Sequence, residues 1–181
     1  MTPLITVLAA NLQIYKFVRN LDTFASNPAS CGAAAFSCVV VGGTTYYADG
    51  VSAQPGEDLE YIILLYNDGG DVQNVVVTDP FVNFTTYQAT TIQVLPNTTA
   101  ADGAGACSAA ATGTCTVTGS LSAANVDDTL ATGGDFGGVN TTPDPDEITV
   151  FAGAGANEVG AIGGTIDAGN VSVVRYLVQI D

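Results

Sequence analysis

The segment Pro55–Pro80 reads PGEDLEYIILLYNDGGDVQNVVVTDP and contains two strand patterns separated by a turn. The first pattern, Asp58–Tyr66, alternates, so that one face carries large apolar side chains and the opposite face begins with acids. The apolar residues are Leu59, Tyr61, Ile63 and Leu65, and the acids are Asp58 and Glu60. The second pattern, Gln73–Asp79, is rich in valine. Asn67–Gly70 lies between them and tolerates positive φ, so the segment predicts a β-hairpin.

Three further stretches have the two-residue period of strands: Leu12–Val18, Glu147–Phe151 and Val171–Ile180. The first stretch places Leu12, Ile14 and Val18 on one face, and the last places Val174, Tyr176, Val178 and Ile180 on one face. Clusters of Gly, Pro, Asn and Asp separate these stretches. This arrangement is typical of an antiparallel sandwich or barrel, so we expect an all-β protein.

Helical patterns are scarce. One short helix or turn is predicted within Ser120–Leu130, with Ser122 as its N-cap. The segments 100–119 and 131–145 are rich in Ala, Gly, Thr and Asp, and we interpret them as long surface loops. The chain length suits one domain, which we place at residues 12–181 after an N-terminal extension of residues 1–11.

The composition excludes several functions. The chain has 181 residues, with 18 Asp and Glu against 3 Lys and Arg, for a net charge of −15. Nucleic acid is therefore excluded as a partner, and anionic membranes are disfavoured. The chain has no histidine, so it cannot supply a Ser-His-Asp triad or a histidine-ligated zinc or haem site. Composition favours a structural or binding protein over an enzyme, with no catalytic residues or bound cofactor expected.

The four cysteines are Cys31, Cys38, Cys107 and Cys115. The absence of a Cys-x-x-Cys motif argues against a zinc ribbon or a thioredoxin-like site. Of the pairings that four cysteines allow, two local disulfides, Cys31–Cys38 and Cys107–Cys115, are the simplest, and they indicate an oxidising, extracellular location. The alternative is four buried free thiols. No apolar run reaches the length of about 18 residues that a bilayer span requires, so we expect no membrane span.

The central segment resembles the conserved-repeat β-sandwich domain of bacterial and archaeal cell-surface proteins. The matching positions are Pro55, Gly56, Tyr61, Asn67, Gly69, Asn74, Val75, Val77, Asp79 and Pro80. The resemblance implies an immunoglobulin-like sandwich used in adhesion, surface layers or fibres, and it brings no catalytic residues with it. Such domains often occur as tandem repeats, whereas this chain holds one copy. A single domain that acts outside a cell needs an anchor or self-assembly.

Acidic residues gather in one loop region. They are Asp127, Asp128, Asp135, Asp144, Asp146 and Glu147. Oxygen ligands at this density suit calcium, although the spacing of an EF-hand is absent. The alternative is a set of solvated loop acids that keep the protein soluble.

Lys16 is the only lysine, and it shares a strand face with Leu12, Ile14 and Val18. A lysine that points inward needs a carboxylate partner, and we expect a buried ion pair with Asp79. The alternative is a lysine near a strand end whose amine reaches water.

Four glycosylation sequons begin at Asn83, Asn97, Asn140 and Asn170. Acceptor asparagines must be exposed, and we expect Asn97 and Asn140 to lie in loops. If the source glycosylates its surface proteins, these two are the favoured sites.

The segment Leu4–Ala9 is apolar on both strand faces, and Asn11 leads directly into the next strand. A free segment of this kind is prone to aggregation, because its backbone groups are unpaired. We therefore expect Met1–Ala10 to be a donor strand that completes the sheet of a neighbouring subunit. The residues expected to be buried in this contact are Leu4, Ile5, Val7 and Leu8.

A head-to-tail contact of this kind need not close, so it builds a filament of identical subunits. The sequence thus predicts a structural subunit of an extracellular filament or pilus. The alternative function is a monomeric or anchored surface adhesin or binding module. The absence of tryptophan disfavours a carbohydrate-binding platform.

Overall fold

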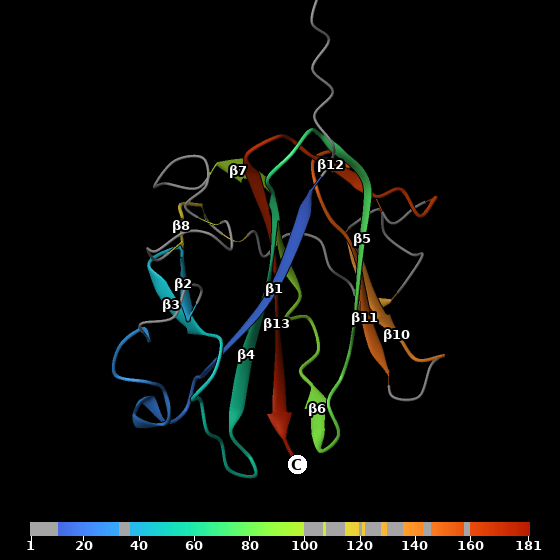
Figure 1. Cartoon of the computed structure of the whole chain (residues 1–181). Coiled ribbons are helices and arrows are strands. Elements are labelled where there is room, and N and C mark those ends of the chain that lie inside the picture. The colour runs from blue at the N-terminus through green and yellow to red at the C-terminus, as the bar shows by residue number, and fades with distance from the viewer. Residues whose placement is uncertain are drawn as a thin grey trace, which may run out of the picture.

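The structure is a computed structural model (Figure 1). It describes residues 11–32, 37–99, 107, 115–119, 121, 128–129, 136–142, 146–157 and 160–181. The expected donor strand lies outside the described residues, as does most of the stretch in which a short helix was predicted.

The described residues form two β-sheets (Figure 1). The larger sheet has the order β6-β13-β4-β1-β3-β2-β8, with β7 also paired to β13, and the smaller has the order β12-β5-β11-β10-β9. The strands are β1 (Leu12–Asn20), β2 (Cys38–Val41), β3 (Thr44–Tyr47), β4 (Asp58–Asn67), β5 (Val72–Pro80), β6 (Thr85–Tyr87), β7 (Gln93–Thr99), β8 (Cys115–Val117), β9 (Asp128–Thr129), β10 (Gly137–Asn140), β11 (Glu147–Phe151), β12 (Gly164–Ile166) and β13 (Asn170–Ile180). One short 3-10 helix, η1, covers Phe24–Ser26. The expected all-β sandwich is confirmed.

Most neighbouring strands are antiparallel, as the sequence predicted. The two exceptions among the described strands are the pairs β2–β8 and β9–β10, which are parallel. Both pairs lie at the outer ends of their sheets.

The larger sheet is buried on both faces. One face packs on the smaller sheet, through residues such as Ile63, Val77 and Val174. The opposite face of β1, β4 and β13 packs under β2, β3 and β8, which belong to the same sheet and therefore curl over it (Figure 1). The residues of this second core include Phe17, Val39, Val41, Tyr46, Ile62, Leu64, Tyr66, Val117, Val171 and Val173.

The two-sided burial changes the interpretation of Asp58–Tyr66. The face that begins with Asp58 and Glu60 continues with Ile62, Leu64 and Tyr66, and these three are at most 1% exposed. Alternation alone does not reveal this second core, because a strand covered on both sides carries apolar residues at successive positions.

The predicted hairpin between the two central strands is wrong. β4 pairs with β1 and β13, whereas β5 pairs with β11 and β12 in the other sheet. Both edges of β4 are occupied, so the chain crosses to the second sheet after Asn67. The buried Asn67 side chain fixes this crossing, because its Nδ2 donates to the carbonyl oxygens of Gly70 and Ile166, each at 2.8 Å.

Both disulfides join the cysteines that the sequence analysis paired. The Cα atoms are 5.4 Å apart in Cys31–Cys38 and 4.7 Å apart in Cys107–Cys115. Cys107 and Cys115 are buried in the second core, so this bridge holds the chain against β8. Disulfides form and persist in oxidising compartments, which indicates a secreted or extracellular protein.

Removing a buried side chain on the newly found face should destabilise the protein strongly. Ile62 is fully buried, so Ile62→Ala should lower the free energy of unfolding by about 2–5 kcal/mol. Ile162 is 50% exposed, and Ile162→Ala, the matched control, should change it by less than about 1 kcal/mol. Urea unfolding followed by circular dichroism measures both. Equal effects would show that the second face is not a core.

Candidate functional site: an open edge between the sheets

An open groove runs along the edge of the sandwich between β1 and β5. It is lined by Ile14, Lys16, Ile63, Val76, Val77, Thr78 and Asp79. Val76–Asp79 are four successive residues of β5, so side chains from both faces of that strand line the groove. A groove of this kind follows the edge of the strand rather than one of its faces.

This edge of β5 has no strand beside it in the described part of the chain. Val76–Pro80 pair with β11 along the other edge, and β12 pairs with β5 only at Val72 and Val75. The groove is not lined by β11. The backbone groups of Val76–Asp79 that point away from β11 therefore border the groove and are available to another strand, whereas Pro80 has no N–H to donate.

Two apolar side chains beside this edge remain exposed. Ile14 shares its strand face with Leu12 and Val18, which pack on the core between the sheets, yet Ile14 is 61% exposed. Val76, on the outer face of β5, is 46% exposed. Ile14 is exposed because no described strand lies along the edge of Val76–Pro80 away from β11, so the smaller sheet does not extend over it there. Among the described strands, none covers Ile14.

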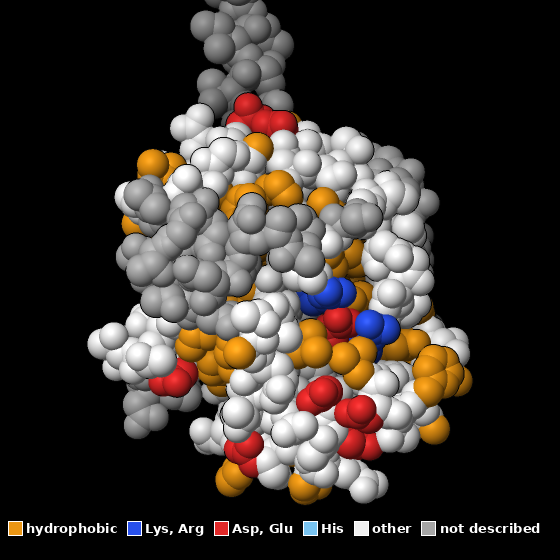
Figure 2. Space-filling model, turned by 180° about the vertical axis from the view of Figure 1, so that it is seen from behind, with side chains coloured by type: hydrophobic (Ala, Val, Ile, Leu, Met, Phe, Trp, Pro, Cys, Tyr) orange, Lys and Arg blue, Asp and Glu red, His pale blue; other side chains and the backbone are white. Residues whose placement is uncertain are grey.

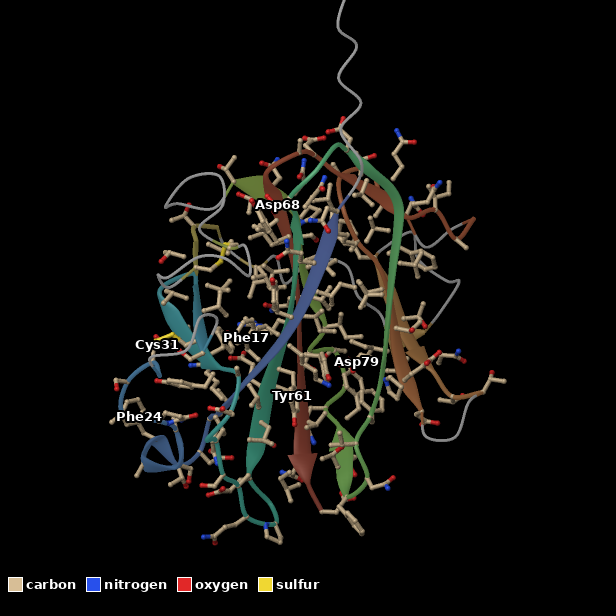
Figure 3. The ribbon with its side chains drawn as sticks, in the orientation of Figure 1. Phe17, Phe24, Cys31, Tyr61, Asp68 and Asp79 are labelled. Carbon is tan, nitrogen blue, oxygen red and sulfur yellow. A yellow bond between two sulfur atoms is a disulfide. The ribbon has the colours of Figure 1, made fainter. Side chains whose placement is uncertain are left out.

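Lys16 and Asp79 meet at the inner end of the groove and join the two sheets. The Lys16 Nζ lies 2.7 Å from Oδ2 and 2.9 Å from Oδ1 of Asp79. The Tyr176 hydroxyl donates to Asp79 Oδ2 at 2.5 Å, and the ammonium lies 4.6 Å from the centre of the Tyr61 ring. Figure 3 shows Tyr61 and Asp79 between the sheets, and Phe17 on the opposite side of β1.

This ion pair is only partly buried, which corrects the expectation of a buried pair. The side chain of Lys16 is 35% exposed and that of Asp79 is 15% exposed. Water reaches the amine because the groove is open beside it. Burial and the nearby Asp79 carboxylate both raise the pKa of the Tyr176 hydroxyl, so Tyr176 remains a hydrogen-bond donor to Asp79.

A second charged cluster, which the sequence analysis missed, lies on the other face of the large sheet. The Glu60 side chain is only 4% exposed and contacts Arg19 Nε at 2.5 Å and Arg175 Nη1 at 3.2 Å. The Tyr46 hydroxyl donates to the same carboxylate at 2.9 Å, and the Arg19 guanidinium lies 5.2 Å from the centre of the Tyr46 ring. Figure 2 shows basic side chains gathered around an acidic one in a hollow of the molecule.

The sequence did contain a signal for this cluster, namely that the chain has very few basic residues to pair with its many acids. Lys16, Arg19 and Arg175 are the only basic residues of the chain, and each pairs with a carboxylate that is at most 15% exposed. Their role is structural, because each neutralises an acid that strand pairing buries.

The predicted calcium ligands are not brought together by the described residues. Asp127, Asp135 and Asp144 lie outside the described residues, as does the side chain of Asp128. Glu147 Oε1 accepts a hydrogen bond from Asn140 at 3.2 Å, and Asp146 lines a surface pocket near Phe84. Within the described ranges no group of three or more potential metal ligands occurs.

The sequon asparagines differ in accessibility. Asn97 and Asn140 lie in β7 and β10 rather than in loops, because their segments pair with β13 and β11. The amides of Asn97, Asn140 and Asn170 donate to Asp167, Glu147 and Asn97 respectively. Asn83 is exposed.

Comparison with protein-family models, curated proteins and solved structures found no match to this chain. The described part of the chain contains no helix that is long and apolar enough to cross a bilayer.

The buried cluster should make stability depend on alkaline pH. Burial, followed by the charge of Glu60 and its hydrogen bond, raises the pKa of Tyr46 from 10.0 to about 12. The unfolded chain then releases this proton before the folded chain does, so the free energy of unfolding falls as pH rises from 10.0 to about 12. Tyr46→Phe should make the fall shallower in urea titrations at successive pH values. Tyr47→Phe, on the same strand, controls for the loss of a hydroxyl. An unchanged slope in Tyr46→Phe would contradict the assignment.

Proposed function

We propose that this protein is the structural subunit of an extracellular filament or pilus, in which the N-terminal segment of one subunit adds as a strand to the sandwich of its neighbour. The observation that carries this proposal is the exposure of Ile14, a core-facing residue of β1. A sandwich that leaves such a residue uncovered is short of one strand, and a strand from another subunit supplies what is missing.

The position of Asn11 supports an intermolecular contact. Its carbonyl oxygen accepts a hydrogen bond from the Asp68 N–H at 3.0 Å, so the chain is still in line with β1 where the sandwich begins. To return to its own domain, the chain would have to reverse within Met1–Ala10. A reversal would use about two to five of these residues, whereas a segment that continues in line with β1 offers its whole length to a neighbouring subunit.

The chemistry of the segment also fits a subunit joint. Subunits of charge −15 repel one another, so the joint must rest on apolar burial and backbone hydrogen bonds. Met1–Ala10 has no charged side chain. Burying Leu4, Ile5, Val7 and Leu8 would contribute about 6–12 kcal/mol before ordering costs. The joint is heterologous, so repetition gives a filament of identical subunits rather than a dimer.

The location and the sequence resemblance agree with this function. Two disulfides suit a subunit that works outside the cell. The similarity to the conserved-repeat domains of bacterial and archaeal surface proteins favours an immunoglobulin-like sandwich that serves in fibres or surface layers.

A second candidate function is a monomeric or anchored surface adhesin. The observation that favours it is a pair of exposed aromatic rings, Phe24 at 87% and Phe84 at 80%. Phe84 holds a positive φ of 66°, a conformation that costs energy in a non-glycine residue and that clusters at binding sites. Negative-stain microscopy separates the two functions, because fibres indicate a filament subunit and dispersed particles indicate an adhesin.

Deleting Met1–Ala10 should abolish polymerisation without unfolding the domain. All fourteen elements of the structure lie C-terminal to this segment, so the truncated chain should retain its circular dichroism spectrum. It should remain monomeric in sedimentation and should bind a synthetic peptide of residues 1–10. Filaments that form normally after the deletion would overturn the proposal.

A point variant of the full chain gives a milder test. Val7→Asp places a charge in the segment that is expected to be buried, and it should prevent filaments. Thr2→Asp, outside the apolar stretch, is the matched control and should assemble like the unmodified protein.

A further inference from the structure

We infer that the acceptor for this strand is the free edge of β5 at Val76–Pro80, and that the inserted segment Met1–Ala10 of a second copy runs parallel to β5. This inference rests on the proposed function. It adds the acceptor site of the donor strand and the direction in which that strand runs. Other strands, among them β8 and β9, also lie at the ends of their sheets and could accept a strand. Whether a filament forms and which strand edge accepts the donor are therefore separate questions.

The apolar surface of the groove matches the donor segment on both sides. Inside the sandwich the groove offers Ile14, Ile63 and Val77, and outside it offers Val76. A strand added along β5 would place one face on Ile14 and the other beside Val76. An ordinary edge strand is apolar on one face only, whereas Leu4–Leu8 has Leu4 and Leu8 on one face and Ile5 and Val7 on the other.

The length also matches. The free edge of β5 covers five residues, Val76 to Pro80, and the apolar part of the donor covers five, Leu4 to Leu8. Ala9, Ala10 and Asn11 then remain as the link to β1 of the donor subunit. The groove therefore needs no part of the donor beyond the residues that precede the first strand.

The direction follows from how the chain enters the domain. β1 begins beside the turn that joins β4 to β5, since Asn11 bonds Asp68 in that turn. β1 and β5 both run away from this end of the molecule (Figure 1). When subunits stack with their β1 axes aligned, a donor segment that continues straight into its own β1 is parallel to β5 of the next subunit. A segment folded back on its own domain would be antiparallel to β5.

The acceptor is tested with charged variants of the full chain. Ile14→Asp and Val76→Asp place a short, charged side chain in the groove, where it cannot extend to water as lysine does. Both should raise the protein concentration at which filaments first sediment by at least about tenfold, which corresponds to about 1.4 kcal/mol of lost contact. The matched controls are Ile162→Asp and Val82→Asp, which are also exposed, at 50% each, but lie away from the groove. They should assemble normally.

Mixing two defective variants distinguishes the acceptor from the donor. Val7→Asp subunits keep an intact groove, and Val76→Asp subunits keep an intact donor segment. Each alone should remain monomeric, whereas an equimolar mixture should give one-to-one dimers and no larger species in analytical ultracentrifugation. Circular dichroism of each variant confirms that the loss is not unfolding. If Val76→Asp unfolds, Ile14→Asp replaces it, because Ile14 lines the same groove from β1.

Cysteine cross-linking measures the direction. Single cysteines placed along Leu4–Leu8 are tested in chains that also carry Val76→Cys or Thr78→Cys, both on the outer face of β5. In a parallel pair, the donor position that cross-links best to residue 78 is C-terminal to the one that cross-links best to residue 76. In an antiparallel pair, the order is reversed.

The outcomes separate the two proposals. If Ile14→Asp and Val76→Asp still form filaments but Val7→Asp does not, β5 is not the acceptor, while the proposal of strand addition is retained. Two results together would overturn both the filament and the second copy as occupant. These are an unmodified chain that never assembles and cysteine variants whose cross-links form within one chain. Filaments whose cross-links show the antiparallel order would overturn the direction.

Discussion

The position of β4 between β1 and β13, with both of its faces covered, is the constraint on which the rest of the structure depends. Ile63 and Leu65 pack toward the smaller sheet, while Ile62 and Leu64 pack under β2 and β3. Because both edges of β4 are taken, the next strand must cross to the second sheet, and this crossing creates the sandwich. The same strand delivers Glu60 to a buried position, where a carboxylate needs cations.

The placement of the few basic residues follows from that requirement. A chain of charge −15 has three cations, and it uses Arg19 and Arg175 on one face of the sheet and Lys16 on the other. Asp79 and Glu60 are thereby neutralised. In the proposed filament, association between copies of so acidic a chain cannot rest on charge, so apolar contact and backbone pairing remain as the means.

The open edge at β5 is the counterpart of the covered centre. β4 is enclosed on every side, but no described strand lies along the outer edge of Val76–Pro80, and Ile14 is left uncovered. The Lys16–Asp79 pair lines the groove, and the stacked rings of Tyr61 and Tyr176 lie beside this pair. The groove is thus bounded inside by a polar link between the sheets and outside by a strand edge, and these are the two features that the proposed acceptor uses.

Much of the fold could be predicted from local sequence signals. Two-residue alternation located the central strands, the short loops between cysteines indicated both disulfides, and a lone lysine on an apolar face pointed to Asp79. Each of these signals depends on residues close together in the chain, or on a residue type so rare that few partners are available. The charged cluster around Glu60 was not predicted, because its members come from four strands that are far apart in the sequence.

The sequence by itself located β1, β4, β5, β11 and β13, the all-β class of the fold, and an N-terminal segment that is apolar on both faces. The interpretation of 100–119 and 131–145 as surface loops was wrong for β8 and β10, which pair with β2 and β11. Only the tertiary structure decided that β4 and β5 part into different sheets, that the large sheet has a second core, and that β5 keeps a free edge. The physical reason is that alternation fixes the conformation of a strand and its two faces, whereas its partners depend on which edges the other strands have already occupied.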